Sequence, residues 1–308
     1  MIFLRLSDGL GNQLFQYAYA RCLQEKYKEI IWINIESYKD NGEREYSLSH
    51  FKLNPNVYVL DNIWGKLHYK YIEHVIDKER KERVKKQYTD IEDTNNKEMI
   101  AKKKGICLAL PSPFKYYQFP MTKRKNKLAI GYFQSEKYFR EIRDIIIKEF
   151  TLKEPLPENV KKLMKVMSKQ NSVCVHIRRG DYLKIKWKEL NICDENYYLQ
   201  AMDVIAENVA EPVFYIFSNS ETDLKWIEKN YHFKYPVQYV NMNNPDYVEL
   251  KLMSACKHFV ISNSTFSWWA QYLSSNQDKV VVAPDRWYKS SKYSDEYIYM
   301  DTWKRVKV

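Results

Sequence analysis

The stretch Ser172–Tyr182, SVCVHIRRGDY, decides the fold. Its first six residues form a nearly continuous apolar run, which is typical of a strand buried on both faces in a parallel sheet. One histidine, two arginines and one aspartate are gathered in the run HIRRGDY, where that strand ends. Open α/β sheets bind ligands at the carboxyl ends of their strands, so the same stretch predicts both a buried strand and a binding site.

Alternating strand and helix patterns continue on both sides of this stretch. In the second half, strands are predicted at Val213–Ser218, Val237–Val240, His258–Ser262 and Lys279–Ala283, and helices over about 158–169, 195–209, 222–230, 245–256 and 264–274. In the first half, strands are predicted at Ile2–Leu6 and Ile30–Ile35, and helices over Asn12–Lys28 and Lys137–Phe150. The pattern predicts an α/β chain with a βαβ unit at its start and a doubly wound parallel sheet in its second half.

The chain has 308 residues, which favours about two domains. Two prolines in TLKEPLPEN, residues 151–159, follow a predicted helix and are typical of a linker. We therefore expect an N-terminal α/β domain over 1–152, a C-terminal Rossmann-like domain over 153–290, and a tail over 291–308.

The charge of the chain is uneven. The net charge is +11, and residues 61–128 hold 17 Lys/Arg against 9 Asp/Glu, a net of +8. This basic insert has two interpretations: solvated helices and loops, or contact with an anionic membrane surface or an acidic glycan. A basic nucleic-acid-binding protein is a remote alternative, since the charge lies away from the motifs and no nucleic-acid-binding signature occurs.

Several classes of protein and site are not indicated. No apolar run is long enough for a transmembrane helix, and the start MIFLRLSDGLGNQ is typical of a first strand rather than a signal peptide. The five cysteines form no CxxC, so neither a disulfide framework nor a zinc site is predicted. No Asp-x-Asp pair offers ligands to a divalent metal. We expect a cytoplasmic protein without metal or other cofactor.

Three further features carry candidate binding residues. The turn DGLGNQ, Asp8–Gln13, opens a helix with two glycines and presents Asn12; an ordinary tight turn is the alternative. In ISNSTFSWW, Ser264 and Thr265 can cap a helix, and the hydroxyls and free N–H groups together can bind an anion. Glu249, on a predicted helix, could accept hydrogen bonds from the N1–H and the 2-amino group of guanine. The alternative is a solvated acid on a helix surface.

The adjacent arginines of HIRRGDY suit an anionic ligand, because a guanidinium is a permanently charged planar fork that matches phosphate. We expect one of Arg178 and Arg179 to point into the protein and the other toward the site. A structural ion pair is the alternative for Arg179.

Four motifs occur in order along the chain: GLGNQLFQYA (Gly9–Ala18), GYFQSEKYF (Gly131–Phe139), HIRRGDY (His176–Tyr182) and LMSACKHFVISNSTFSWWAQYL (Leu252–Leu273). Together they resemble the motifs of glycosyltransferase family 11, the α-1,2-fucosyltransferases, in their bacterial form. The resemblance implies a GT-B-like fold with two Rossmann-type domains facing a central cleft. It implies GDP-β-L-fucose as donor, a terminal galactose on a glycan as acceptor, inversion at the anomeric carbon and no metal. A fucosyltransferase of the same fold with another acceptor or linkage remains open.

The resemblance also implies roles for single residues. Arg178 would hold the β-phosphate, His176 would lie near the ribose and guanine, and Glu249 would read guanine. Asn12 would face the diphosphate and fucose from the other domain. Asp181 is the first candidate for the base that takes the acceptor proton, and its alternative role is to orient Arg178 or Arg179. The remaining donor-binding residues implied are Asn263, Ser264, Thr265 and Phe266.

Overall fold

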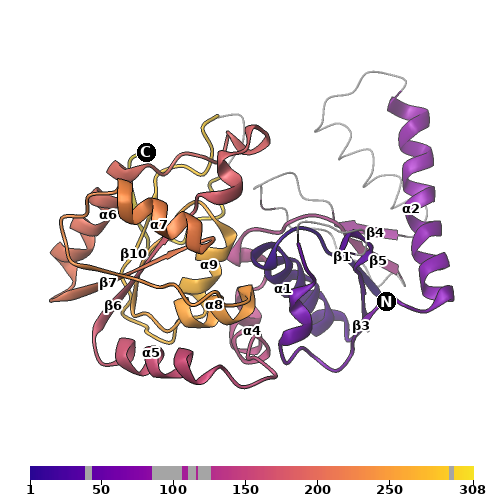
Figure 1. The fold of residues 1–308 in the computed structure, drawn as a ribbon. Coiled ribbons are helices and arrows are strands. Elements are labelled where there is room, and N and C mark those ends of the chain that lie inside the picture. The colour runs from indigo at the N-terminus through magenta and orange to yellow at the C-terminus, as the bar shows by residue number, and fades with distance from the viewer. Residues whose placement is uncertain (39–43, 85–105, 110–115, 117–125, 291–294) are drawn as a thin grey trace. The chain divides into compact units, whose positions relative to one another are not determined.

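The computed structural model describes residues 1–38, 44–84, 106–109, 116, 126–290 and 295–308 (Figure 1). The chain divides into two compact units, Met1–Thr151 with Glu296–Ile298, and Leu152–Asp295 with Tyr299–Val308. Each unit contains one sheet, and every described strand pair is parallel. The predicted α/β class is confirmed, since the chain has two Rossmann-type units, as a GT-B-like fold does.

The first unit has a five-stranded sheet in the order β3-β2-β1-β5-β4. Its strands are β1 (Ile2–Arg5), β2 (Ile31–Asn34), β3 (Val57–Val59), β4 (Ile106–Ala109) and β5 (Asn126–Ala129). Helix α1 (Leu10–Tyr27) connects β1 to β2 and begins two residues earlier than predicted, directly after Gly9. Because β2 lies on one side of β1 and β5 on the other, the strand order reverses between β1 and β5, which makes this the switch point of the first sheet.

The remaining described elements of the first unit are η1 (Glu36–Tyr38), η2 (Ser47–His50), α2 (Ile63–Val84), η3 (Glu136–Tyr138), η4 (Arg140–Ile142) and α4 (Arg143–Glu149). The single helix predicted over Lys137–Phe150 is therefore wrong in its first half. Phe139 has φ −146° and ψ 9°, outside the helical region, and its fully buried ring lies 6.0 Å from that of Phe15 on α1. Packing of this ring overrides the local helical preference.

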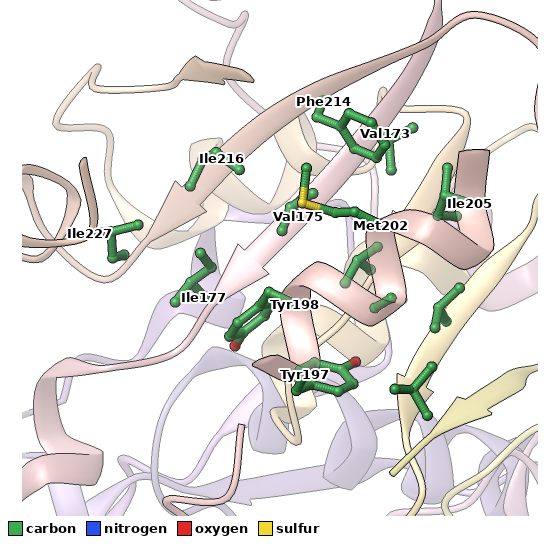
Figure 2. Close-up of a cluster of buried hydrophobic side chains, with 14 of the residues drawn as sticks. Val173, Val175, Ile177, Tyr197, Tyr198, Met202, Ile205, Phe214, Ile216 and Ile227 are labelled. Carbon is green, nitrogen blue, oxygen red and sulfur yellow. The ribbon is translucent and has the colours of Figure 1, made fainter. Parts of the chain in front are cut away.

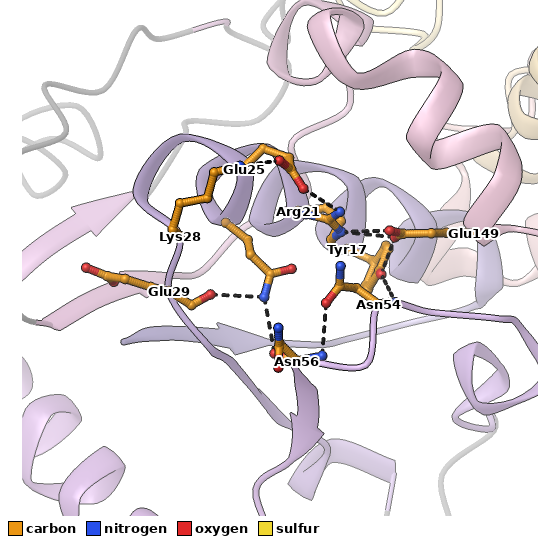
Figure 3. A network of polar contacts seen from close by, with 9 residues as sticks. Tyr17, Arg21, Glu25, Lys28, Glu29, Asn54, Asn56 and Glu149 are labelled. Carbon is orange, nitrogen blue, oxygen red and sulfur yellow. Dashed lines mark hydrogen bonds and ion pairs between the residues drawn. The ribbon is translucent and has the colours of Figure 1, made fainter.

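A polar network joins α1 to α4 (Figure 3). The Tyr17 hydroxyl donates to Glu149 Oε2 at 2.5 Å, and Arg21 Nε donates to Glu149 Oε1 at 3.0 Å. Arg21 also donates to Glu25 at 2.7 Å, and Glu25 accepts from Lys28. Since Arg21 is almost fully buried, these carboxylates provide the partners that a buried guanidinium needs.

The second unit has a six-stranded sheet in the order β11-β10-β9-β6-β7-β8. Its strands are β6 (Asn171–Ile177), β7 (Pro212–Ser218), β8 (Val237–Tyr239), β9 (His258–Val260), β10 (Val281–Pro284) and β11 (Lys304–Val306). Its helices are α5 (Glu158–Ser168), α6 (Glu195–Asn208), α7 (Glu221–Asn230), α8 (Asp246–Met253) and α9 (Thr265–Tyr272), with the short turns η5 (Gly180–Leu183) and η6 (Ile185–Trp187). Every strand and helix predicted for 158–283 is confirmed within a few residues.

The core of this unit explains why SVCVHI is almost wholly apolar (Figure 2). Val173, Val175 and Ile177 of β6 pack in one buried cluster with Tyr197 and Met202 of α6. Cys174 is also fully buried and His176 nearly so, so both faces of β6 lie inside the protein. A central strand covered on both faces cannot alternate apolar and polar residues.

Residues 295–308, the described part of the segment expected as a tail over 291–308, contribute to both units. Glu296–Ile298 belong to the first unit, and β11 pairs in parallel with β10 in the second. Val306 is largely buried at the edge of the second core, so this end of the described chain is packed.

Most of the predicted basic insert, 61–128, lies outside the described residues. Among the helices that the structure describes, none is both long and apolar enough to span a membrane. Cys22, Cys174, Cys193 and Cys256 are free thiols.

Candidate functional site

The switch point of the second sheet lies between β6 and β9. These strands are neighbours, and the chain continues from β6 to β7 and β8 on one side, while β9, β10 and β11 lie on the other. HIRRGDY follows β6 and SNSTFS follows β9, so two motifs 80 residues apart meet at one edge. This is the position at which open α/β sheets bind their ligands.

His176 joins the two motifs. Its Nδ1 shares a hydrogen bond of 2.5 Å with Ser267 Oγ on α9 and one of 3.3 Å with Ser262 Oγ after β9. The side chain is only 2% exposed, and burial, with a smaller contribution from nearby Arg178, lowers the pKa of His176 to about 3. The imidazole is therefore neutral near pH 7 and holds the start of α9 against the end of β6.

Arg178 and Asp181 form an ion pair within the loop after β6. One terminal nitrogen of Arg178 lies 2.8 Å from each oxygen of Asp181, and the two side chains are 15% and 16% exposed. The Arg178 guanidinium also lies 5.3 Å from the ring centre of Tyr182. Arg178 Nε is buried and has no hydrogen-bond partner among the described residues, so this arginine retains donor capacity.

Arg179 turns toward α7. Its Nε lies 3.6 Å from Asp223, its guanidinium lies 3.2 Å from the ring centre of Trp226, and its backbone N–H donates to Asn219 at 3.1 Å. The alternative of a structural ion pair is therefore the one that the structure supports for Arg179.

The start of α9 is capped as its sequence predicts. The Ser264 hydroxyl accepts from the backbone N–H of Phe266 at 3.3 Å, and Thr265 is the first helical residue. Thr265 and Phe266 are partly exposed, and the Phe266 ring centre lies 5.9 Å from that of His176. A helix start with no acidic residue in its first turn is suited to an anion.

Asn263 serves the protein itself. Its side-chain amide donates to the backbone carbonyls of Leu190 at 2.8 Å and Trp287 at 2.9 Å. The backbone carbonyl of Asn263 accepts from the Tyr182 hydroxyl at 3.0 Å. Both amide hydrogens are used and the residue is 1% exposed. Asn263 therefore positions the loop before α9, and its expected contact with the donor stays a prediction.

Glu249 lies on α8 and is not a freely solvated acid. Its Oε2 accepts from Asn244 Nδ2 at 2.9 Å, and burial raises the pKa of Glu249 to about 7. Hydrogen-bond donors of a ligand would favour the charged form of this carboxyl group, so a group with such a pKa is a candidate binding residue.

Asn12 lies in the first turn of α1, in the other unit, and is described there by itself. Its Oδ1 accepts from Gln134 Nε2 at 2.8 Å, which links the start of α1 to the loop after β5. All the predicted site residues except Asn12 therefore belong to the second unit.

Sequence reasoning missed Ser262, Ser267 and Asn244, which hold His176 and Glu249 in place. The repeated hydroxyls of ISNSTFS were visible, but their pairing with a histidine on another strand carries no local signal. Among the described residues, no group of three or more His, Cys, Asp or Glu side chains is arranged to hold a metal ion.

Two parallel-sheet α/β units, with an arginine, hydroxyls and a helix start at the switch point of the second, define the class as a GT-B-like fold with a site suited to an anion. The model of glycosyl transferase family 11 matches residues 1–307, and the chain belongs to this family. The resemblance seen in the four motifs is thereby confirmed, and the protein is a glycosyltransferase.

Two relatives from Escherichia coli match along nearly their whole length. The O-antigen biosynthesis glycosyltransferase WbnK is 30% identical over 97% of this chain and 98% of the relative, and an alpha-1,2-colitosyltransferase is 28% identical over 100% and 99%. Galactoside alpha-(1,2)-fucosyltransferase 2 from Pongo pygmaeus is 28% identical over 50% of this chain and 46% of its own. Among solved structures, fucosyltransferase NodZ from Bradyrhizobium is 12% identical with a TM-score of 0.48, over 88% of this chain and 92% of that one.

Proposed function

We propose that the protein transfers L-fucose from GDP-β-L-fucose to the 2-hydroxyl of a terminal galactose on a glycan, with inversion and without metal. Membership of family 11 and relatives named for α-1,2 transfer support this reaction. The observation that carries it is Arg178, whose Nε has no partner among the residues that the structure describes, at the switch point of the second sheet that also precedes α9.

The proposed chemistry is a single displacement. The acceptor hydroxyl attacks C1 of fucose and releases its proton to water, the bond from C1 to the phosphate oxygen breaks, and GDP leaves with the bonding electron pair on the opposite face. Negative charge grows on the β-phosphate as this bond breaks. Arg178 and the backbone at Ser264, Thr265 and Phe266 stabilise that charge, and one such contact is worth about 100-fold or more in rate.

Asp181 takes the second of its two expected roles in this proposal. Because both of its oxygens accept from Arg178, it holds the guanidinium in place and is poorly suited to receive the acceptor proton. His176 acts in the same indirect way, through α9, and Glu249 accepts from the guanine edge.

The experiment compares Arg178→Ala with Asp181→Asn, using GDP-fucose and a β-galactoside, and assigns the product linkage by NMR. We expect Arg178→Ala to lose about 100-fold or more in kcat and Asp181→Asn to lose less, with an α-1,2 product from the wild type. Near wild-type transfer by Arg178→Ala would remove the core of the proposal. An α-1,3 or α-1,6 product would contradict the proposed linkage but not the proposed donor.

A second donor is favoured by one observation, the full-length similarity to an alpha-1,2-colitosyltransferase. Colitose differs from L-fucose by the absence of one ring hydroxyl, so GDP-colitose is the competing substrate to assay. A higher kcat/KM for GDP-fucose supports the first donor, and the reverse order replaces it. The relative named for O-antigen biosynthesis supports a glycan of the bacterial surface as the acceptor class.

We also propose that this cytoplasmic enzyme touches the anionic inner face of the membrane through α2. Ile63, Trp64, Leu67 and Tyr71 are 68%, 79%, 54% and 64% exposed. At about 100° of rotation per residue these positions form one apolar stripe. The opposite side of α2 is buried through Tyr69 and Ile72.

The composition of this α2 stripe favours a lipid surface as its occupant. Tryptophan and tyrosine prefer the membrane interface, and Lys66 and Lys70 border the stripe within a segment of net charge +8. Positive charge beside interfacial aromatic residues complements anionic headgroups.

A further inference from the structure

We propose that Asp8, held by Tyr132, binds a hydroxyl of the acceptor sugar and so determines acceptor specificity. This inference rests on the proposed function and adds a residue that neither the motifs nor the relatives assign. Its ligand class is a neutral sugar hydroxyl, recognised by a carboxylate.

Asp8 and Tyr132 lie at the switch point of the first sheet. Asp8 follows β1 and Tyr132 follows β5, and these strands are neighbours at the place where the strand order reverses. The Tyr132 hydroxyl donates to Asp8 Oδ2 at 2.6 Å, across 124 residues of sequence. A binding residue at this position meets the general expectation for open α/β sheets.

The backbone at Asp8 is held in an unusual conformation. Its φ is +63°, in the left-handed region, which a non-glycine residue adopts at some energetic cost. Two side chains fix it there, because the Asp8 carbonyl accepts from Gln13 Nε2 at 3.0 Å and from the Tyr38 hydroxyl at 2.9 Å. Strain of this kind collects at functional sites, where the surrounding structure maintains it.

The partner loop after β5 is fixed in the same way. Gly131 has φ +145° and Phe133 has φ +52°, and the Gly131 carbonyl accepts from Gln16 Nε2 at 3.0 Å. Gln134, which donates to Asn12, is 9% exposed, and its Oε1 has no hydrogen-bond partner among the described residues. An unsatisfied buried acceptor beside two strained turns indicates a site that a ligand completes.

The charge of Asp8 selects the kind of ligand. Within the described parts of the chain Asp8 makes no ion pair, and Tyr132 is the hydrogen-bond donor to its carboxylate. This half-buried carboxylate therefore keeps acceptor capacity, since two oxygens offer about four sites. Its negative charge opposes a phosphate and favours a hydroxyl donor, which points to a sugar rather than the nucleotide diphosphate. Separate KM values for acceptor and donor distinguish the acceptor sugar from fucose.

The matched variants are Asp8→Asn and Asp8→Gly, because both replacements tolerate a positive φ while removing the charge. Tyr132→Phe removes the hydroxyl that holds the carboxylate. We expect both Asp8 variants to raise the acceptor KM about ten- to hundredfold, the effect of losing a hydrogen bond to a charged group. Tyr132→Phe should raise it less, and GDP affinity and donor KM should stay unchanged in all three.

The assay measures initial rates against acceptor and donor separately, together with GDP binding and thermal unfolding of each variant. An unchanged acceptor KM in folded Asp8→Asn, with an active wild type, overturns this inference alone. A lower kcat at unchanged acceptor KM also overturns it, because that pattern belongs to a group acting on the proton. If the wild type transferred fucose to no β-galactoside, the proposed function would fail and this inference with it.

Discussion

One terminal nitrogen of Arg178 lies 2.8 Å from both carboxylate oxygens of Asp181, so two of the three charged groups of HIRRGDY pair with each other. Across the described parts of the chain, no group pairs with Arg178 Nε. An arginine anchored at one edge and free at the other is oriented in advance, and preorganisation of this kind supports electrostatic stabilisation of a leaving group.

We predict that lysine cannot replace Arg178. Arg178→Lys keeps the charge but loses the planar fork, so we expect a loss of at least about tenfold in kcat. Free guanidinium ion should partly restore the activity of Arg178→Ala and should not affect the wild type. Wild-type kinetics in Arg178→Lys would mean that a point charge suffices.

We predict that GDP affinity depends on pH through Glu249. Its pKa of about 7 means that lowering the pH from 8 to 6 protonates most of the carboxyl group, which then cannot accept two hydrogen bonds. We expect a roughly tenfold weaker affinity at pH 6, measured by calorimetry. Glu249→Gln should bind weakly with little dependence on pH, whereas the exposed Glu221→Gln should keep the wild-type profile. A wild-type profile in Glu249→Gln would exclude this role.

We predict that His176 makes folding sensitive to acid. Its pKa is about 3 in the folded protein and about 6.5 when unfolded, so the unfolded state takes up the proton first. The stability it confers is complete above pH 6.5 and is lost as the pH falls toward 3, by up to about 1.4 kcal/mol per pH unit. The free energy of unfolding, measured with urea at several pH values, should depend less on pH in His176→Gln than in the wild type. The exposed His232→Gln should keep the wild-type dependence on pH. An equal dependence on pH in all three proteins would contradict this prediction.

We predict that Asn263→Ala destabilises the second unit. Two backbone carbonyls lose their donor, and each unsatisfied buried group costs about 1–3 kcal/mol. The control is Asn208→Ala, because the exposed Asn208 makes one hydrogen bond to Val204. Thermal unfolding should separate the two variants, and equal melting temperatures would show that the loop before α9 does not need this amide.

We predict that the α2 stripe carries membrane binding. Trp64→Ser with Leu67→Ser should reduce co-sedimentation with phosphatidylglycerol vesicles about tenfold or more, because both exposed apolar side chains lose their insertion energy. Val166→Ser, at an exposed apolar position on α5, should bind as the wild type does. Equal binding to phosphatidylcholine, or no effect of the double substitution, would contradict a charged lipid surface as the partner, and concentration-dependent dimerisation would assign the stripe to a second copy.

The sequence predicted the second unit well because local pattern and tertiary role agree there. The buried run of β6 and the hydroxyl cap of α9 can both be recognised from neighbouring residues alone. Prediction was wrong near Phe139, where the ring packs against α1. The two carbonyl partners of Asn263 lie 73 and 24 residues away, so no local pattern could indicate them. The Asp8–Tyr132 contact is of the same kind, since sheet order alone brings those loops together. Residue type therefore predicted the location of the site, whereas the partners of its side chains depended on long-range packing.

The return of residues 296–308 to both units has a consequence for biosynthesis. During translation the first unit lacks Glu296–Ile298, and the second lacks its edge strand β11, until the ribosome has passed residue 306. Neither unit can mature fully as a nascent domain, and the nascent sheet exposes the edge of β10 in the meantime. An unpaired edge strand is a template for association with other chains. A tag or truncation within these residues would therefore affect the yield of folded protein before it affected the reaction.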